Sequence, residues 1–162
     1  MKTNKNITFA IALFIVVLTS CKKDVDPGGT AVEAMAGDWY VRAYDANGQL
    51  MYPNFFAIHT YNTAANTPTE MWFDDHFWGT KFKGAVNVPA LTFGGPKVKN
   101  SDPTYNVDIT VSNGKILLKG TKGPASKSPT DSIYYEVEYS DDPGTKYYMA
   151  GYKRTGFEAD DH

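Results

Sequence analysis

Apolar and polar side chains alternate along most of the chain after residue 37, in short segments that turn residues separate. In residues 132–139, for example, every second side chain is Ile, Tyr or Val. A period of two is typical of strands with one buried face, and no window shows the 3.6-residue period of an amphipathic helix. The pattern predicts strands over residues 38–44, 49–52, 55–62, 70–74, 80–88, 91–93, 105–111, 115–119, 132–139 and 146–154.

Two Asn-Gly pairs, at residues 47–48 and 113–114, predict tight hairpin turns between neighbouring strands. Short strands joined in this way form an antiparallel meander, which closes on itself because open sheet edges invite aggregation. We therefore expect an all-β fold, an antiparallel up-and-down β-barrel of about eight strands, over residues 37–162. A β-sandwich is the alternative.

The first residues predict a leader and not a part of the fold. Lys2 and Lys5 precede an apolar run over residues 7–18, which is shorter than the roughly 20 residues of a membrane-spanning helix. The run ends in Leu-Thr-Ser-Cys21, which resembles the lipobox of bacterial lipoproteins. That resemblance implies a signal peptide over residues 1–20 and lipidation of Cys21. The alternative is an ordinary secretory signal with an incidental cysteine.

Residues 21–36 are expected to be a flexible tether, because Pro-Gly-Gly interrupts a segment with no periodic pattern. Cys21 is the single cysteine, so the chain cannot form an intramolecular disulfide. A lipid on Cys21 would anchor the protein to a membrane. Lys22 follows the cysteine where inner-membrane lipoproteins carry aspartate, so the resemblance favours the outer membrane, with the periplasmic and the surface-exposed orientation both open. The formal net charge of −2 and the lack of a basic patch argue against nucleic acid as a partner.

Longer stretches of the chain resemble known families. Gly37 and Trp39, with Arg154 at the end of the last strand, resemble lipocalins and the wider calycin group; this implies that Trp39 closes one barrel end and that Arg154 packs across its ring. The stretches "AGDWYVRAYD", "NTAANTPTEMWFDD" and "GYKRTGFEADD" are similar to a family of Bacteroidetes lipoproteins called "lipid-binding putative hydrolase". The family name implies lipid binding in a calycin-like barrel, and it carries no catalytic motif over to this chain.

An alternative function is a hydrolase that acts on a lipid ester or a glycan, and the candidates for its catalysis are Asp74, Asp75 and His76. Adjacent aspartates on a strand point to opposite faces, so Asp74 and His76 would share one face and could act as a general-base pair. The alternative is that the two aspartates cap a turn. No Gly-x-Ser-x-Gly elbow is present, the spacing of the three histidines does not predict a metal site, and no cofactor is expected.

Aromatic residues, 11 of them tyrosine, favour a binding function. They could line a pocket in the barrel for a small hydrophobic ligand or lipid, with a glycan as the rival ligand, or they could simply fill the barrel. A further hypothesis is an accessory subunit of an outer-membrane uptake complex, with an outer-membrane protein as its partner. The expected ligand-binding residues are Trp72, Asp74, His59, Tyr61, Tyr135 and Trp78.

Overall fold

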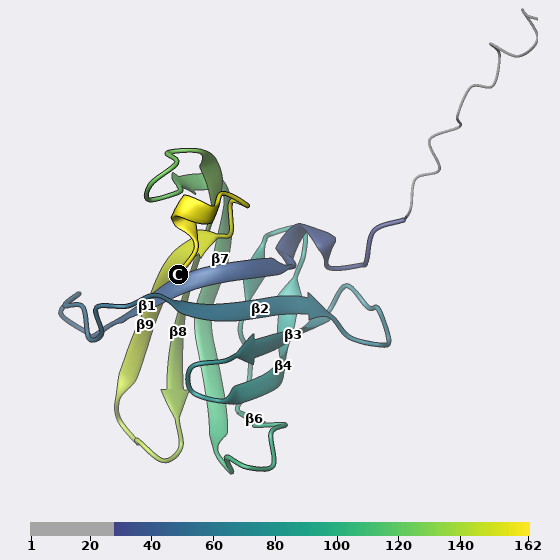
Figure 1. Cartoon of the computed structure of the whole chain (residues 1–162). Helices are drawn as coiled ribbons and strands as arrows, with labels where there is room; N and C mark the ends of the chain where they lie inside the picture. Colours follow the sequence, from purple (N-terminus) through teal and green to yellow (C-terminus); the bar gives the residue numbers. More distant parts are fainter. Residues whose placement is uncertain (1–27) are drawn as a thin grey trace, which may run out of the picture.

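The computed structural model describes residues 28–162, which form nine strands and two short 3-10 helices (Figure 1). The predicted leader and Cys21 lie outside the described residues. Within residues 28–162, no helix is long and apolar enough to cross a membrane. The elements are η1 (Glu33–Met35), β1 (Gly37–Tyr44), β2 (Phe56–Asn62), β3 (Glu70–Asp75), β4 (Thr80–Asn87), β5 (Thr92–Phe93), β6 (Val98–Lys99), β7 (Asp108–Lys122), β8 (Pro129–Tyr139), β9 (Lys146–Lys153) and η2 (Glu158–Asp160).

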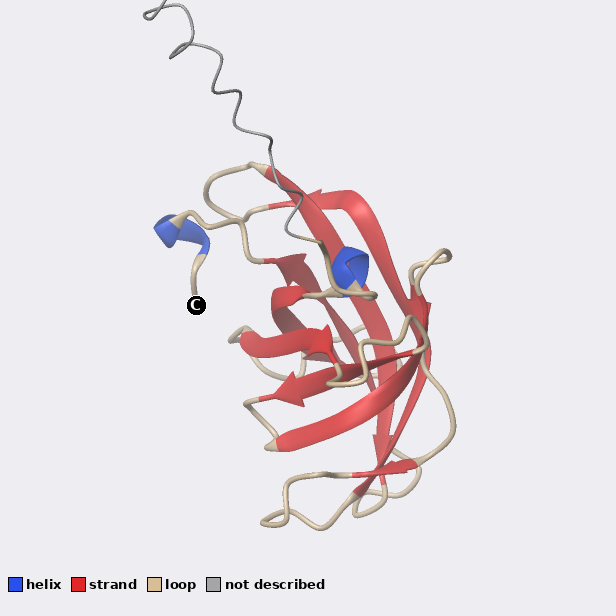
Figure 2. Cartoon of the chain, turned by 90° about the vertical axis from the view of Figure 1, so that its right-hand side faces the viewer, coloured by secondary structure: helices blue, strands red, loops and turns tan. Residues whose placement is uncertain are grey.

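The strands form one closed antiparallel sheet. Strands β5, β4, β3, β2, β1, β9, β8 and β7 are neighbours in that order, and the short β5 pairs back onto β7, with Phe93 opposite Gly114. Figure 2 shows the strands wrapping around a common interior. The short β6 lies beside β7 as a ninth strand. The prediction of an up-and-down barrel with eight strands in the ring is confirmed.

The second Asn-Gly pair is not a hairpin turn, so that prediction is wrong. Strand β7 runs through Asn113 and Gly114 without reversing, and its register with β8 shifts between Ser112 and Lys115. Asn113 has a positive φ of 54°, and a Cβ on Gly114 would lie 2.4 Å from the Phe93 ring. The pair therefore forms a bulge that bends the long strand where β5 closes the barrel.

The first Asn-Gly pair does form a turn, with a positive φ of 74° at Gly48. The predicted strand over residues 49–52, however, is reduced to a single bridge between Tyr44 and Leu50. The partner of β1 is instead β2, in a register that places Gly37 opposite Thr60.

The interior of the barrel is filled by side chains. The cavity among them, bounded by Ile58, Phe73, Tyr135 and their neighbours, has a volume of about 10 Å³. That volume holds about one water molecule. The aromatic residues could either line a pocket inside the barrel or fill it, and in the structure they fill it. The buried apolar side chains include Val41, Phe56, Ile58, Met71, Phe73, Phe82, Phe93, Ile109, Val111, Ile116, Ile133, Tyr135, Val137, Tyr139 and Met149.

Trp39 closes the barrel end at which β1 begins. Its side chain is only 1% exposed, and its Nε1 donates to Thr60 Oγ1 at 2.9 Å. The Thr60 hydroxyl in turn donates to the carbonyl of Met35 at 2.8 Å. Val32 and Met35 are fully buried in the same core, so the folded domain includes the last residues of the segment predicted as a tether.

The cation above Trp39 is Lys153 and not Arg154, which corrects the expected pairing. Lys153 Nζ lies 5.6 Å from the centre of the Trp39 ring, because the two residues are direct partners across β1 and β9. Cross-strand partners point to the same face of a sheet. Arg154 lies one residue beyond β9, and its guanidinium forms a two-point ion pair with Asp161.

Candidate functional site

Four of the predicted ligand-binding residues lie together on the outer face of the barrel. We call His59, Tyr61, Trp72 and Asp74 the outer-face cluster; His59 pairs with Asp74, and Tyr61 with Trp72, across β2 and β3. Tyr61 donates its hydroxyl to Asp74 at 2.9 Å. These four expected ligand-binding residues are therefore neighbours, but they lie on the outside of the barrel wall and not in a pocket inside the barrel.

Lys81 joins the outer-face cluster through its ammonium group. It forms an ion pair with Asp74 at 2.9 Å and lies 5.6 Å from the centre of the Trp72 ring. Partial burial alone would raise the pKa of Asp74, but hydrogen bonds from Lys81 and Tyr61 outweigh it and hold that pKa below its ordinary value. Asp74 is therefore a paired carboxylate at neutral pH.

Asp75 points the opposite way, into the barrel. Its carboxylate accepts the backbone N–H groups of Phe77 at 2.8 Å and Trp78 at 3.2 Å, so the turn cap is confirmed for Asp75 but not for Asp74. Burial raises its pKa from 3.8 to about 6, against the two backbone hydrogen bonds, because a charged carboxylate is poorly solvated there. Tyr135, another predicted ligand residue, is buried among the interior side chains and lines the same 10 Å³ cavity.

The catalytic candidates are thus divided among three environments. Asp74 is paired with Lys81 on the outer face, Asp75 is buried, and His76 is exposed at the turn, with its Nε2 3.6 Å from Asp74. Asp74 and His76 come together as predicted, but they do not line the cavities between β4 and β7. Within residues 28–162, no group of three or more His, Cys, Asp or Glu side chains is arranged to hold a metal ion.

Trp78 belongs to an aromatic lid over the barrel end opposite Trp39. Its ring lies 5.8 Å from Tyr139 and 5.5 Å from Tyr147, while Phe56 and Phe77 stack at 3.8 Å beside it. These rings cover the buried Asp75. The hairpin tip therefore closes over the core of the barrel.

The barrel wall has a gap between β4 and β7, which we call the seam. In the described sheet these strands are not paired with each other; β5 joins them at one end, and Asn100 closes the other by accepting the Lys81 N–H at 2.7 Å. Between these points the chain crosses the seam at Gly94 and Gly95, whose N–H groups bind the carbonyls of Ala85 and Val111, respectively.

Gly94 makes this crossing feasible. Its φ is 142°, and a Cβ there would lie 2.9 Å from the carbonyl oxygen of Val111. A larger residue would push the crossing segment away from β7. The Gly-Gly-Pro sequence at residues 94–96 is typical of a turn, but its position across the seam depends on strand pairing between distant parts of the chain.

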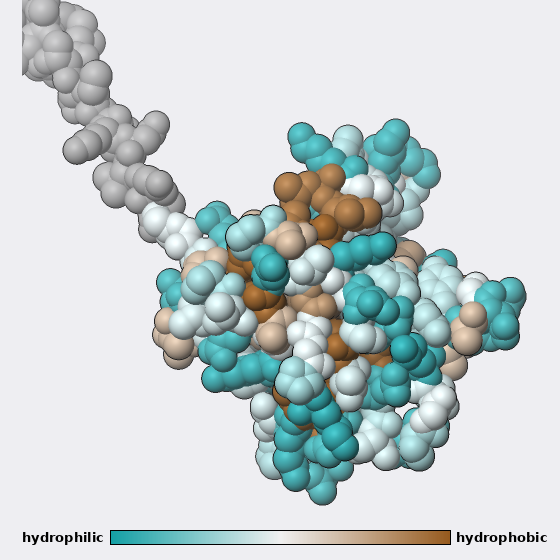
Figure 3. Space-filling model, turned by 180° about the vertical axis from the view of Figure 1, so that it is seen from behind, coloured by the Kyte–Doolittle hydropathy of each residue, from teal (hydrophilic) through white to brown (hydrophobic). Residues whose placement is uncertain are grey.

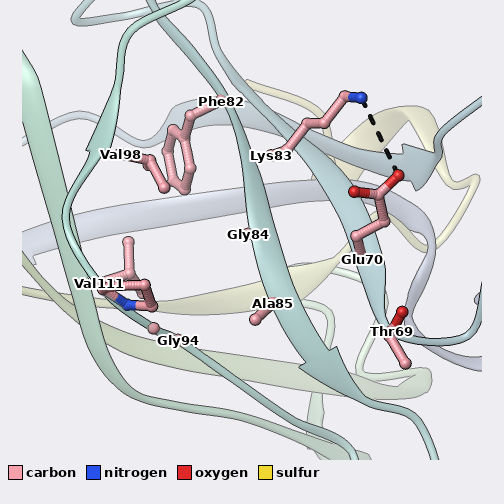
Figure 4. Close-up of a pocket in the computed structure, with 11 residues that line it drawn as sticks. Thr69, Glu70, Phe82, Lys83, Gly84, Ala85, Gly94, Val98 and Val111 are labelled. Atoms are coloured by element: carbon pink, nitrogen blue, oxygen red, sulfur yellow. Dashed lines mark ion pairs between the residues drawn. The ribbon is translucent and has the colours of Figure 1, made fainter.

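The seam holds a cavity of about 280 Å³, the seam cavity. Figure 4 shows Phe82 and Val98 side by side on one side of β4, with Lys83 and Glu70 paired at the rim of the cavity. The walls are mostly apolar, and none of the predicted ligand-binding residues lines them. The lining residues are Thr69, Glu70, Phe82, Lys83, Gly84, Ala85, Gly94, Gly95, Pro96, Val98 and Val111.

A second hollow of about 480 Å³ adjoins the seam cavity over β5. It shares Ala85, Gly94, Gly95 and Val111 with it, so the two form one depression along the seam. The second hollow is a shallow, open depression with polar and apolar lining in equal parts, whereas the seam cavity is mostly apolar and, at about 280 Å³, lies near the lower limit of about 300–1,000 Å³ for small-molecule sites.

Comparisons with known proteins give a family. A model of the family described as "lipid-binding putative hydrolase" matches residues 24–158. A solved structure of a protein of unknown function from Bacteroides ovatus is similar at 17% identity and a TM-score of 0.41, over 74% of this chain and 42% of that chain. The chain thus spans less than half of that protein's length. No curated protein matches. The match over residues 24–158 shows that this chain belongs to the lipid-binding putative hydrolase family.

Proposed function

We propose that this protein is a lipid-anchored protein of the outer membrane that binds the apolar chain of a lipid in the seam cavity. The observation that carries the proposal is an apolar cavity of about 280 Å³ in the wall of a barrel from a lipid-binding family. The interior offers about 10 Å³, so a ligand there would have to displace core side chains. The seam is preferred because it is already open.

The lining of the seam cavity suits hydrocarbon. Phe82, Val98 and Val111 form its apolar base, and Ala85 and Pro96 lie beside the crossing segment. Each methylene that leaves water for such a surface contributes roughly 0.8 kcal/mol. An acyl chain is therefore a better match than a sugar, which would leave its hydroxyl groups without partners.

The rim supplies a polar group for the head of the ligand. Lys83 Nζ lies 3.9 Å from Glu70, and both side chains are partly exposed to solvent. A surface ion pair of this length is weak, about 0–1 kcal/mol. Lys83 can therefore turn from Glu70 to a phosphate or carboxylate of a bound lipid with little loss.

The amino-terminal sequence supports the proposed membrane location. A basic start, a short apolar run and small residues before Cys21 support lipidation of that cysteine. Two or more acyl chains give stable anchoring where a single chain is marginal. A protein held at a membrane by its own lipid would meet its lipid ligand at high local concentration.

Replacing Ala85 by tryptophan tests the site. Ala85 points outward and lines both hollows, so an indole there fills the depression without entering the core. We expect the wild type to release non-covalently bound lipid on solvent extraction, and A85W to release at least about tenfold less. Mass spectrometry of the extract measures the non-covalently bound lipid. Lipid that remains on the denatured protein is covalently attached and measures the anchor separately.

Lys99→Trp is the matched control, because Lys99 is exposed on β6 and lines neither hollow. K99W should carry as much lipid as the wild type. Equal lipid content in A85W and the wild type would refute the seam as the site, provided that their melting temperatures agree.

A further inference from the structure

The hairpin between β7 and β8 exposes two consecutive leucines. Leu117 is 53% exposed and Leu118 is 60% exposed. In a regular strand one of two neighbours would face the interior, but the register of β7 with β8 shifts between Leu117 and Thr121. Lys119, with a positive φ of 51°, lies within this irregularity. The bulge thus directs both leucines outward, which is costly in water unless something covers them.

Lysines surround the leucines on the same hairpin. Their backbone positions are Lys115, Lys119, Lys122 and Lys127. Among the described residues, none of these four ammonium groups has a carboxylate within 4 Å. The nearby Asp131 is occupied, since it accepts the backbone N–H of Lys119 at 2.9 Å and lies 4.0 Å from Lys153. Lys127 donates to the carbonyl of Pro124, and Lys115 lies over the Tyr134 ring, but neither contact cancels the positive charge. The hairpin therefore combines exposed hydrocarbon with positive charge that no carboxylate balances.

The hairpin lies at the end of the barrel at which the described chain begins. Leu117 pairs with Ser132, Ser132 with Tyr152, and Trp39 with Lys153, so the hairpin and the start of β1 share that end. Figure 1 places the hairpin and residues 28–36 in the upper part of the molecule. Seen from behind, apolar side chains form a patch at the top beside the hairpin (Figure 3).

The length of the preceding chain limits the distance to the anchor. Gly28 comes seven residues after Cys21, and seven residues span at most about 25 Å. An anchored Cys21 would therefore hold this barrel end near the bilayer surface. Glu33, Asp38 and Glu158 are also exposed at this end, while Arg154 pairs with Asp161, so the positive charge is confined to the β7–β8 hairpin.

The loops at the far end of the barrel are acidic, in contrast to the β7–β8 hairpin. Its loops carry Asp45, Asp102, Asp141 and Asp142, which an anionic bilayer would repel. Clusters of lysines beside an anchor attract such a surface, and exposed leucines can enter its interfacial layer. The charge distribution thus favours one orientation of the barrel.

We propose that the β7–β8 hairpin is a membrane-docking surface, which inserts Leu117 and Leu118 into an anionic bilayer and holds the barrel with this end toward the lipid. The proposal rests on the lipid anchor of the proposed function and is independent of the seam cavity. It assigns the exposed leucines to a lipid surface in preference to a second copy or another protein.

A fluorescent probe on Leu118→Cys tests the docking. The lipidated full chain, labelled with an environment-sensitive NBD group at L118C, is reconstituted into vesicles of about 70% phosphatidylcholine and about 30% phosphatidylglycerol. We expect the NBD emission to shift to the blue and to rise about threefold relative to detergent-free solution. The same probe at Asp141→Cys, on the far end, should change little. Lys119→Glu with Lys122→Glu in the L118C chain should remove most of the rise.

The outcomes separate the anchor from the docking. Mass spectrometry that finds no acyl chain on Cys21 overturns the anchor and, with it, the docking. An anchored protein whose probe at L118C is as water-exposed as the probe at D141C overturns the docking alone. A blue shift that is already present without vesicles, together with a dimeric mass, assigns the leucines to a second copy and also overturns it. Circular dichroism of each labelled variant confirms that it is folded.

Discussion

Replacing Trp39 by alanine should lower the free energy of unfolding by about 3–5 kcal/mol. The indole is 1% exposed and closes one barrel end, so its removal leaves a cavity that the surrounding strands cannot collapse into. Its loss also leaves the Thr60 hydroxyl without the indole N–H that it accepts at 2.9 Å. Guanidinium unfolding followed by far-ultraviolet circular dichroism measures the change without depending on the lost fluorophore.

Trp72→Ala is the control for size and aromaticity. Trp72 lies on the outer face, where its contacts include the ammonium groups of Lys83 at 5.2 Å and Lys81 at 5.6 Å. Such exposed cation–π contacts contribute about 0.5–1 kcal/mol each. We expect W72A to cost about 1 kcal/mol; equal losses in W39A and W72A would contradict the assignment of Trp39 to the barrel plug.

Replacing Asp75 by asparagine should make the protein more stable at pH 8. The pKa of Asp75 rises from 3.8 to about 6 in the folded state because of burial, so the native protein holds a proton that the unfolded chain releases. Stability therefore falls as the pH rises from about 4 to about 6, by about 3 kcal/mol in total. Asparagine keeps an oxygen for the N–H groups of Phe77 and Trp78 but never ionises. The gain at pH 8 should approach that 3 kcal/mol and vanish near pH 3.

Asp74→Asn is the matched control with the opposite sign. Hydrogen bonds from Lys81 and Tyr61, against the effect of partial burial, lower the pKa of Asp74, so its charge stabilises the fold above the unfolded pKa. D74N should therefore be less stable than the wild type at neutral pH, with the difference disappearing in acid. Urea titrations across pH 3–8 compare each variant with the wild type. If D75N is less stable than the wild type at pH 8, the claim that the buried, charged Asp75 carboxylate destabilises the fold is wrong.

The strands were predictable because their alternation is local. In residues 132–139 the alternating apolar residues Ile133, Tyr135, Val137 and Tyr139 all enter the core, and Glu136 is the one further buried residue of the segment. Alternation likewise separated Asp74 from Asp75 correctly. Alternation predicts which residues share a face of a strand, but it does not predict where a bulge occurs. The second Asn-Gly pair, which forms a bulge in β7, was therefore predicted as a turn.

The candidate site was harder to predict because it depends on how the sheet closes into a barrel. The outer-face cluster is a real group of neighbours, but alternation alone could not say that its face is outside the barrel. The seam cavity forms where β5, only two residues long, brings β4 beside β7. Its lining combines residues that are up to 42 positions apart, from Thr69 to Val111, and no local pattern marks them as one surface. The single sequence signal was Gly94-Gly95, whose need for glycine becomes evident only beside Val111.

Photo-crosslinking with a fatty acid that carries a diazirine near its chain end tests the location of the lipid most directly. The full chain is incubated with the probe, irradiated and digested with trypsin, and the labelled peptides are sequenced by mass spectrometry. Binding in the seam cavity predicts labels within residues 82–99, which supply most of the lining, and their loss in A85W but not in K99W. Labels concentrated instead on interior residues such as Tyr135, or on the aromatic lid around Trp78, would contradict the seam as the lipid site.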